Sequence, residues 1–206
     1  KFVVVYRDSS NSNYGTACVG TISGNSISFG SEVVFNSGTT TYSQVSFDPN
    51  NAGKVVVAYG DGSAGSDGMA IVGTVSGTSI SFGSEVVFNS GVTSYLSLSF
   101  DPNTANKFVV VYRDDSNTDD GTAVVGTISG TSISFGSEVV YNTANTQYND
   151  IAFDPNTANK FVVVYKDIGN GAYGTARVGT VSGTSISFGS AVVFNTGTTS
   201  YLAVAF

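Results

Sequence analysis

Apolar and polar residues alternate with a period of two in several short stretches of this chain, which is the pattern of half-buried β-strands. In residues 95–100, Leu98 and Phe100 share one face of such a stretch. Residues 108–114 form instead a near-continuous apolar run, which is typical of a strand covered on both faces. The pattern therefore predicts an all-β fold. Two further extended segments complete a set of four, namely residues 122–129 and 132–142.

This set of four segments is repeated along the whole chain. The four copies begin at residues 1, 54, 107 and 160, a spacing of 53 residues, and the last copy is shorter than the others. An all-β repeat of about this length with four strands is typical of a propeller blade. The sequence therefore predicts a single domain, residues 1–206, that is a four-bladed β-propeller.

The order of the segments also predicts how the ring closes. The chain begins with the second segment of a repeat and ends with a first segment, residues 201–206. We expect this last segment to complete the first blade, because closure hides sheet edges that would otherwise pair with other chains. Four blades must wedge steeply, so the alternative is self-association of two chains into an eight-bladed ring.

Composition and charge exclude several functions. The net charge is −7, and lysine and arginine are few and dispersed, so nucleic acid is not an expected partner. The chain has no histidine, which removes the usual general base, and we see no nucleophile–base pair. We expect no enzyme, no catalytic residues and no cofactor, with a glycoside hydrolase-like propeller kept as a minority alternative. Its apolar runs are short, so we expect no membrane insertion.

The four copies differ mainly in two sets of loops. The turns between first and second segments, and between third and fourth, barely change. The variable loops lie together at one end of antiparallel blades, and we call this end the variable rim. It comprises residues 9–14, 62–67, 115–120 and 168–173, with residues 39–41, 92–94, 145–147 and 198–200.

Binding residues concentrate on loops that a rigid scaffold carries, so the variable rim is the expected recognition face. Relaxed constraint in exposed loops is the alternative interpretation. The candidate ligand-binding residues are Asn13, Tyr14, Asp67, Asp119, Asp120 and Tyr173, together with Gln44 and Asp150, which we expect to face the central channel.

One variable loop, residues 114–121, is rich in carboxylates. Asp114, Asn117 and Asp119 precede a glycine and form a weak calcium candidate, because calcium prefers oxygen ligands from such loops. The spacing does not match the EF-hand, and an aspartate that binds loop amides is the favoured interpretation. The tyrosines at one fixed repeat position could stack on sugars, but packing between blades is the favoured role. They are Tyr42, Tyr95, Tyr148 and Tyr201.

The segment YRDSSNSNYGTACVGTISGNSISFGSEVVF resembles the near-identical tandem repeats of structural and tail-fibre-like proteins of marine cyanophages. The layout of the repeats is also similar to WD-repeat blades, without their Trp-Asp dipeptide. The first resemblance implies a virion or extracellular protein that binds a carbohydrate or another surface receptor, and it brings no functional residues with it. A structural or engineered symmetric scaffold without a ligand is the alternative.

Overall fold

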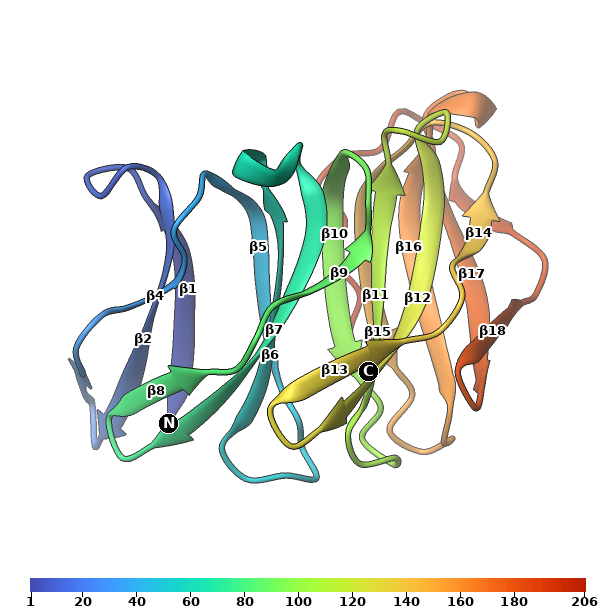
Figure 1. Cartoon of the computed structure of the whole chain (residues 1–206). Coiled ribbons are helices and arrows are strands. Elements are labelled where there is room, and N and C mark those ends of the chain that lie inside the picture. Colours follow the sequence, from blue (N-terminus) through green and yellow to red (C-terminus); the bar gives the residue numbers. More distant parts are fainter.

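The computed structural model describes all 206 residues and consists of β-strands, with two single-turn 3₁₀ helices. The strands form four antiparallel sheets that follow one another along the chain (Figure 1). The predicted all-β fold and its fourfold repetition are confirmed. Neither helix is long enough to cross a membrane.

Each repeat contributes a first, a second and a third strand and a fourth segment that is split in two. The second sheet contains β5 (Thr40–Phe47), β6 (Lys54–Asp61), β7 (Asp67–Ser76), β8 (Ser79–Phe82) and β9 (Val86–Asn89). The third contains β10 (Thr93–Phe100), β11 (Lys107–Asp114), β12 (Asp120–Ser129), β13 (Ser132–Phe135) and β14 (Val139–Asn142). The fourth contains β15 (Thr146–Phe153), β16 (Lys160–Asp167), β17 (Tyr173–Ser182), β18 (Ser185–Phe188) and β19 (Val192–Asn195).

The first sheet has the same order but lacks a first strand. It contains β1 (Phe2–Asp8), β2 (Tyr14–Ser23), β3 (Ser26–Phe29) and β4 (Val33–Asn36). The helices η1 (Gly62–Ala64) and η2 (Ile168–Asn170) lie in the loops that follow β6 and β16.

The second strands of the second and third sheets are apolar throughout because their two faces enter two different cores. In β11, Val110 and Tyr112 pack into the core shared with the second sheet. Val109 and Val111, which alternate with them, pack into the core shared with the fourth sheet. The prediction of a strand covered on both faces is confirmed for β6 and β11.

The fourth segment bends at a conserved place in the repeat, between β13 and β14 in the third sheet. Both short strands pair with β12, and the bend begins at Gly136. A Cβ atom on Gly136 would overlap the carbonyl oxygen of Thr184 in the next sheet. The glycine therefore allows two successive sheets to approach closely.

The turns between first and second strands link successive sheets at the end opposite the variable rim. The carboxylate of Asp101 accepts hydrogen bonds from the backbone N–H of Asn103 in its own turn (2.9 Å) and of Asn159 in the next sheet (3.0 Å). The Asn103 amide donates to the Pro155 carbonyl of that next turn (3.2 Å). Each turn is thus tied to the one that follows it.

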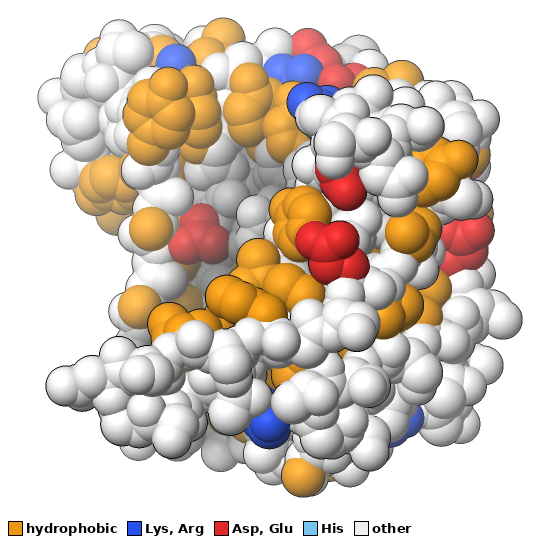
Figure 2. Space-filling view, turned by 90° about the vertical axis from the view of Figure 1, so that its left-hand side faces the viewer, with side chains coloured by type: hydrophobic (Ala, Val, Ile, Leu, Met, Phe, Trp, Pro, Cys, Tyr) orange, Lys and Arg blue, Asp and Glu red, His pale blue; other side chains and the backbone are white.

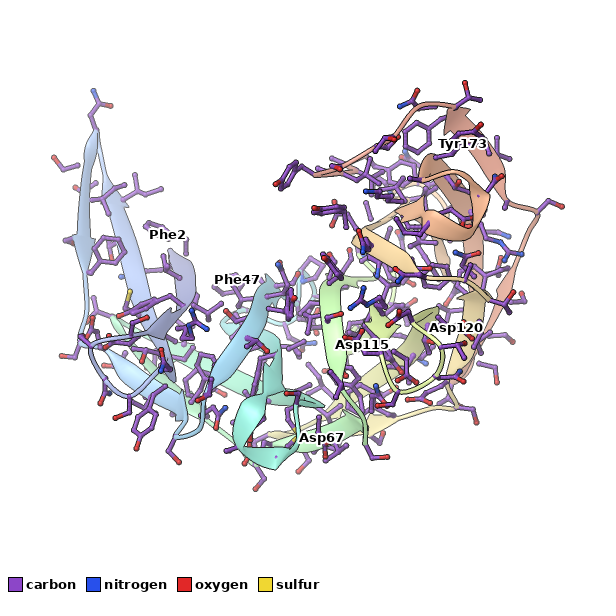
Figure 3. The ribbon with its side chains drawn as sticks, turned by 90° about the horizontal axis from the view of Figure 1, so that it is seen from above. Phe2, Phe47, Asp67, Asp115, Asp120 and Tyr173 are labelled. Atoms are coloured by element: carbon purple, nitrogen blue, oxygen red, sulfur yellow. The ribbon has the colours of Figure 1, made fainter.

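The closure expected of residues 201–206 is not formed, and the four sheets make an open arc (Figure 3). Residues 201–206 form no strand and pair with no part of β1. They lie beside β15, where the Val204 N–H donates to the Asp150 carboxylate (2.8 Å). The physical reason is chain connectivity. A short turn joins each of the three first strands that do form to the second strand of its own sheet. Residues 201–206 have no such turn and are held beside β15, at the far end of the arc from β1.

Candidate functional site

The variable loops gather at one end of the sheets and the uniform turns at the other, as the antiparallel order requires. In Figure 1 the loops after β1, β6 and β16, with η1 and η2, lie along the upper edge. The turns between first and second strands lie along the lower edge. The structure therefore forms the variable rim as one continuous edge.

The aspartate at the end of each of the first three second strands organises the loop that follows, whereas Asp167 accepts from the Asn142 amide instead. The Asp8 carboxylate accepts hydrogen bonds from the backbone N–H (2.9 Å) and the hydroxyl (2.6 Å) of Ser10. Asp61 binds Ser63 in the same way, at 3.0 and 2.6 Å. The hydroxyl of Ser10 is the main cause that lowers the pKa of Asp8. These aspartates thus serve the shape of the loops.

The calcium candidates Asp114, Asn117 and Asp119 do not converge on a common point. Asp114 accepts from the backbone N–H of Ser116 (3.1 Å), and Asp119 accepts from the amide of Asn145 (2.8 Å). The Asn117 amide is 3.4 Å from the Asp120 carboxylate. No three acidic, histidine or cysteine side chains in the structure are grouped so that they could hold a metal ion.

Four of the predicted rim residues occupy one repeat position, at the start of the third strand. Each lies opposite the aspartate that closes the second strand of its own sheet, so the structure distributes them along the rim, one per sheet. Figure 3 shows the three that it labels, Asp67, Asp120 and Tyr173, at separate points of the arc. The four residues are Tyr14, Asp67, Asp120 and Tyr173.

Asn13 and Asp119 connect neighbouring repeats through their backbone. Both have a left-handed conformation, with φ of 65° and 64°. The carbonyl of Asn13 accepts from the Thr40 N–H (3.0 Å), and that of Asp119 accepts from the Thr146 N–H (3.1 Å). These two positions fix the path from one sheet to the next.

Gln44 and Asp150 lie on first strands, at one repeat position. Gln44 is exposed, whereas Asp150 is half-buried and accepts from the Ser97 hydroxyl (2.7 Å) and the Val204 N–H. Asp150 thus joins β10, β15 and the C-terminal segment. The structure does not bring it together with the rim residues named above.

The feature that sequence reasoning undervalued is a ladder of four tyrosines, which directly follow residues 39–41, 92–94, 145–147 and 198–200 of the variable rim. Ring centroids are 5.6 Å apart for Tyr42 and Tyr95, 5.3 Å for Tyr95 and Tyr148, and 5.0 Å for Tyr148 and Tyr201. We call these four residues the tyrosine ladder. The repeat position was visible in the sequence, but contacts between residues 53 positions apart were not.

All four ladder tyrosines have a left-handed backbone, with φ of 50°, 47°, 54° and 57° in chain order. A bulky residue seldom adopts this conformation, because its Cβ crowds the backbone. In the three formed first strands the ladder residue lies within a register shift of the strand pair. The irregularity interrupts strand pairing at the place where the rings meet one another.

Cations lie over the ladder. The Arg113 guanidinium is 5.0 Å from the centre of the Tyr95 ring, and the Lys166 ammonium is 5.7 Å from the centre of the Tyr148 ring. Asp115 holds Arg113 in place, with Nε–Oδ1 and Nη2–Oδ2 distances of 2.6 and 2.9 Å. This hydrogen bonding is the main cause that raises the pKa of Arg113.

The end of the ladder at Tyr42 borders a hollow of about 350 Å³. Arg7, Thr41, Tyr42 and Ser43 line it, and Arg7 occupies the same repeat position as Arg113. The third arginine, Arg177, lies elsewhere and stacks on Phe188 (5.7 Å). The arginines therefore form no single cluster, while aromatic, cationic and hydroxyl groups meet at the tyrosine ladder.

Comparison with known proteins adds no relative. No family model matches the chain, and no curated protein matches it. The resemblance to cyanophage repeats therefore stays a prediction, and the function has to be argued from geometry.

Proposed function

We propose that the four sheets are blades of a β-propeller and that the chain is a non-enzymatic recognition module whose ligand binds at the tyrosine ladder. The observation that carries this proposal is the left-handed backbone shared by all four ladder tyrosines. Strained backbone costs free energy and tends to be kept where it serves a site. A structural role alone would be met equally well by residues that adopt this conformation without strain.

A carbohydrate is the ligand class that suits the ladder best. A sugar ring offers apolar C–H faces and a rim of hydroxyls, and binding sites commonly combine aromatic surface with a few placed polar groups. The ladder has aromatic rings beside the Ser94 hydroxyl, the Arg113 guanidinium and the Asp115 carboxylate. A glycan of a host or cell surface would fit a virion or extracellular protein.

Catalysis is the weaker proposal for the same surface. Acid–base chemistry on a sugar needs two carboxyl groups in different environments that face one bond. The rim carboxylates are instead paired with other groups of the chain: Asp115 and Asp119 both form ion pairs with Arg113, and Asp119 also accepts from the amide of Asn145. A recognition surface requires no such pair.

A scaffold without a ligand is the second candidate, and one observation favours it. Several rim side chains bind groups within the chain, such as Asp61 with Ser63 and Ser94 with Asp115. Polar groups that already have a hydrogen-bond partner within the chain gain little free energy from binding a ligand. The two candidates differ in whether the ladder binds anything at all.

An array of surface glycans, probed with the wild-type chain and Tyr95→Asn, tests the proposal. Asparagine tolerates the left-handed conformation of residue 95, so this substitution removes the ring and keeps the backbone. We expect Tyr95→Asn to bind the preferred glycan at least about tenfold more weakly, because the central ring of the ladder is lost.

The matched control is Asn156→Ala, which changes an exposed turn at the opposite rim. It should bind as the wild type does. Undiminished binding by Tyr95→Asn would move the site away from the ladder, and a wild-type chain that captures no glycan would favour the scaffold.

A further inference from the structure

Successive sheets pack through one contact, which the chain makes three times with nearly constant geometry. An aromatic residue at the end of each sheet packs on a tyrosine of the next second strand, with centroid distances of 5.1, 5.1 and 5.2 Å. The same residue packs on a phenylalanine of the next sheet at 5.8, 5.8 and 5.6 Å. We call the face that points to the next sheet the forward face, and the opposite one the backward face.

A turn of the next sheet covers a glycine on each forward face. Cβ atoms on Gly30, Gly83 and Gly136 would overlap the carbonyl oxygens of Thr78, Thr131 and Thr184, respectively. The corresponding Gly189 has only the Val178 carbonyl oxygen nearby, at 3.7 Å from an added Cβ. The site that receives the turn is therefore empty on the fourth sheet.

Both ends of the arc expose the apolar halves of this contact. On the backward face of the first sheet Ile27 is 60% exposed, whereas the equivalent Ile80 is 5% exposed. On the forward face of the fourth sheet Phe194 is 54% exposed, whereas the equivalent Phe88 is 6% exposed. Figure 2 views the molecule from the side of the first sheet and shows a hollow whose walls carry many hydrophobic side chains.

The fourth sheet also has a hollow on its forward face, with a volume of about 410 Å³. Lys160, Phe161, Val178 and Phe206 are among the residues that line it. In the second and third sheets the equivalent lysines reach the next turn, where Lys54 donates to the Gly130 carbonyl (3.0 Å) and Lys107 donates to that of Gly183. The structure places no such turn beside Lys160, whose ammonium donates to the Thr180 hydroxyl (2.6 Å).

The strand edges at the two ends match as well. β1 has no partner on its outer edge, because the first sheet lacks a first strand. Residues 201–206 lie beside β15, as β15 lies beside β10, and thus occupy the place of a further first strand. An unpaired edge of this kind accepts an added strand.

We propose that a second copy of this chain docks head to tail, with its first sheet against the forward face of the fourth sheet. Residues 203–206 then supply the missing first strand. The register of β15 with β16 places Phe206 opposite Phe2 of the second copy, Val204 opposite Val4 and Ala203 opposite Val5.

A second copy, and not the first sheet of the same chain, is the occupant because the two ends of one arc face each other across an opening. Figure 3 shows Phe2 on the opposite side of this opening from Tyr173. Closure within one chain would have to bend all three internal contacts away from their constant geometry. A second copy uses the same contact without such a change, and two different faces make a heterologous contact that can close a ring of two chains.

Light scattering of the wild type and two blocked variants tests the proposal. Ile27→Asp places a charge on the backward face, and Gly189→Leu fills the site that receives the turn, at a position with free space in the single chain. We expect the wild type to have a mass of at least 42.2 kDa, twice the 21.1 kDa of one chain. Each variant alone should have the mass of one chain.

An equimolar mixture of the two variants should form a dimer of 42.2 kDa, because one intact contact remains between them. Ser28→Asp is the matched control, since it adds the same charge on the outward side of the same strand and should associate like the wild type. Circular dichroism checks that both variants are folded. A wild-type mass of one chain at every concentration, or a mixture that stays monomeric, overturns the proposal.

A disulfide between residues 5 and 203 distinguishes the second copy from closure within one chain. The variant combines Val5→Cys and Ala203→Cys with Cys18→Val, which removes the only native thiol. Oxidation should give a covalent dimer on a non-reducing gel, because opposite positions in a strand pair are within reach of a disulfide. A cross-linked single chain, or no cross-link, contradicts the proposed register.

Discussion

Tyr141 occupies a repeat position at which the first two sheets have phenylalanine. Its ring fills the same inter-sheet site as Phe35 and Phe88, but its hydroxyl is fully buried and has no hydrogen-bond partner. Burial is also the main cause that raises the pKa of this phenol well above its ordinary value. The chain therefore carries a phenylalanine in equivalent sites and an unsatisfied polar atom in this one.

We expect Tyr141→Phe to stabilise the protein by about 1 kcal/mol, because it removes an unsatisfied buried hydroxyl and keeps the ring. Urea unfolding of the two proteins at equal concentration measures the difference. Phe88→Tyr provides the reverse change in an equivalent site and should destabilise. A lower unfolding midpoint for Tyr141→Phe would mean that the hydroxyl has a partner after all.

The glycine at the bend of the fourth segment gives a second comparison. Gly136→Ala should destabilise the protein by about 1–3 kcal/mol, because the added methyl group overlaps the Thr184 carbonyl of the next sheet. The same change at Gly189 makes only an ordinary contact with the Val178 carbonyl oxygen (3.7 Å) and should leave the stability of a single chain nearly unchanged. Thermal unfolding of the two variants under dilute, monomeric conditions checks the difference, and equal effects would refute the role of close approach.

Residue types predicted the loop aspartates but not the contacts of the tyrosine ladder. The aspartates that shape the loops were expected, because aspartate commonly binds the amides of its own turn. The tyrosine ladder was visible only as a fixed position, and packing between blades was the favoured interpretation. Its left-handed backbone depends on the register shift in each first strand, which the spacing of apolar residues does not encode.

At the scale of elements, a hydrogen bond joins each of the first three second strands to the bend of its own fourth segment. The Tyr112 hydroxyl donates to the Glu138 carboxylate (2.6 Å), and Tyr6 and Tyr59 make the same bond to Glu32 and Glu85. The fourth sheet has Ala191 at the position of the glutamate, and Tyr165 lacks this partner. Burial is the main cause that raises the pKa of Tyr59 and Tyr112 far above the ordinary value of tyrosine, and this hydrogen bond is the second cause. Burial raises the pKa of Tyr165 to about 12.

These shifts predict a loss of stability in alkaline solution. The folded pKa of Tyr59, Tyr112 and Tyr165 is higher than the unfolded one, near 10, so their contribution to stability is complete below about pH 10. It decreases as the pH rises from there toward the folded values. Urea midpoints from pH 8 to 12, with tyrosinate absorbance recorded in parallel, should show this decline.

Tyr112→Phe is the control, because it removes one of the groups with a raised pKa and should reduce the slope of stability against pH. A folded protein in which every tyrosine titrates near pH 10 would contradict the prediction. An unchanged slope of stability against pH in Tyr112→Phe would also contradict the prediction.

The element pattern was the most predictable part of the fold. A continuous apolar run predicted second strands with two buried faces. The sequence predicted residues 132–142 as one extended segment. The structure divides this segment into two strands, which pair with different parts of the same third strand.

At the scale of the whole molecule, a constant repeat predicts sheets in series but does not fix the curvature of their arc. Curvature depends on the angle at which one sheet packs on the next, which side-chain volumes and the covered glycines determine together. For this reason four equal repeats were consistent with a closed ring, whereas the structure leaves the first and last sheets apart. The unpaired edge of β1 is the clearest consequence.

Hydrogen–deuterium exchange at β1, followed over a range of protein concentrations, tests the head-to-tail account most directly. We predict that the outward-facing amides among residues 2–5 exchange rapidly in dilute solution and become protected as concentration rises, because an added strand then hydrogen-bonds them. Amides of β11, which are internal at every concentration, provide the reference. Protection of β1 that is independent of concentration, or no protection at any concentration, would contradict the account.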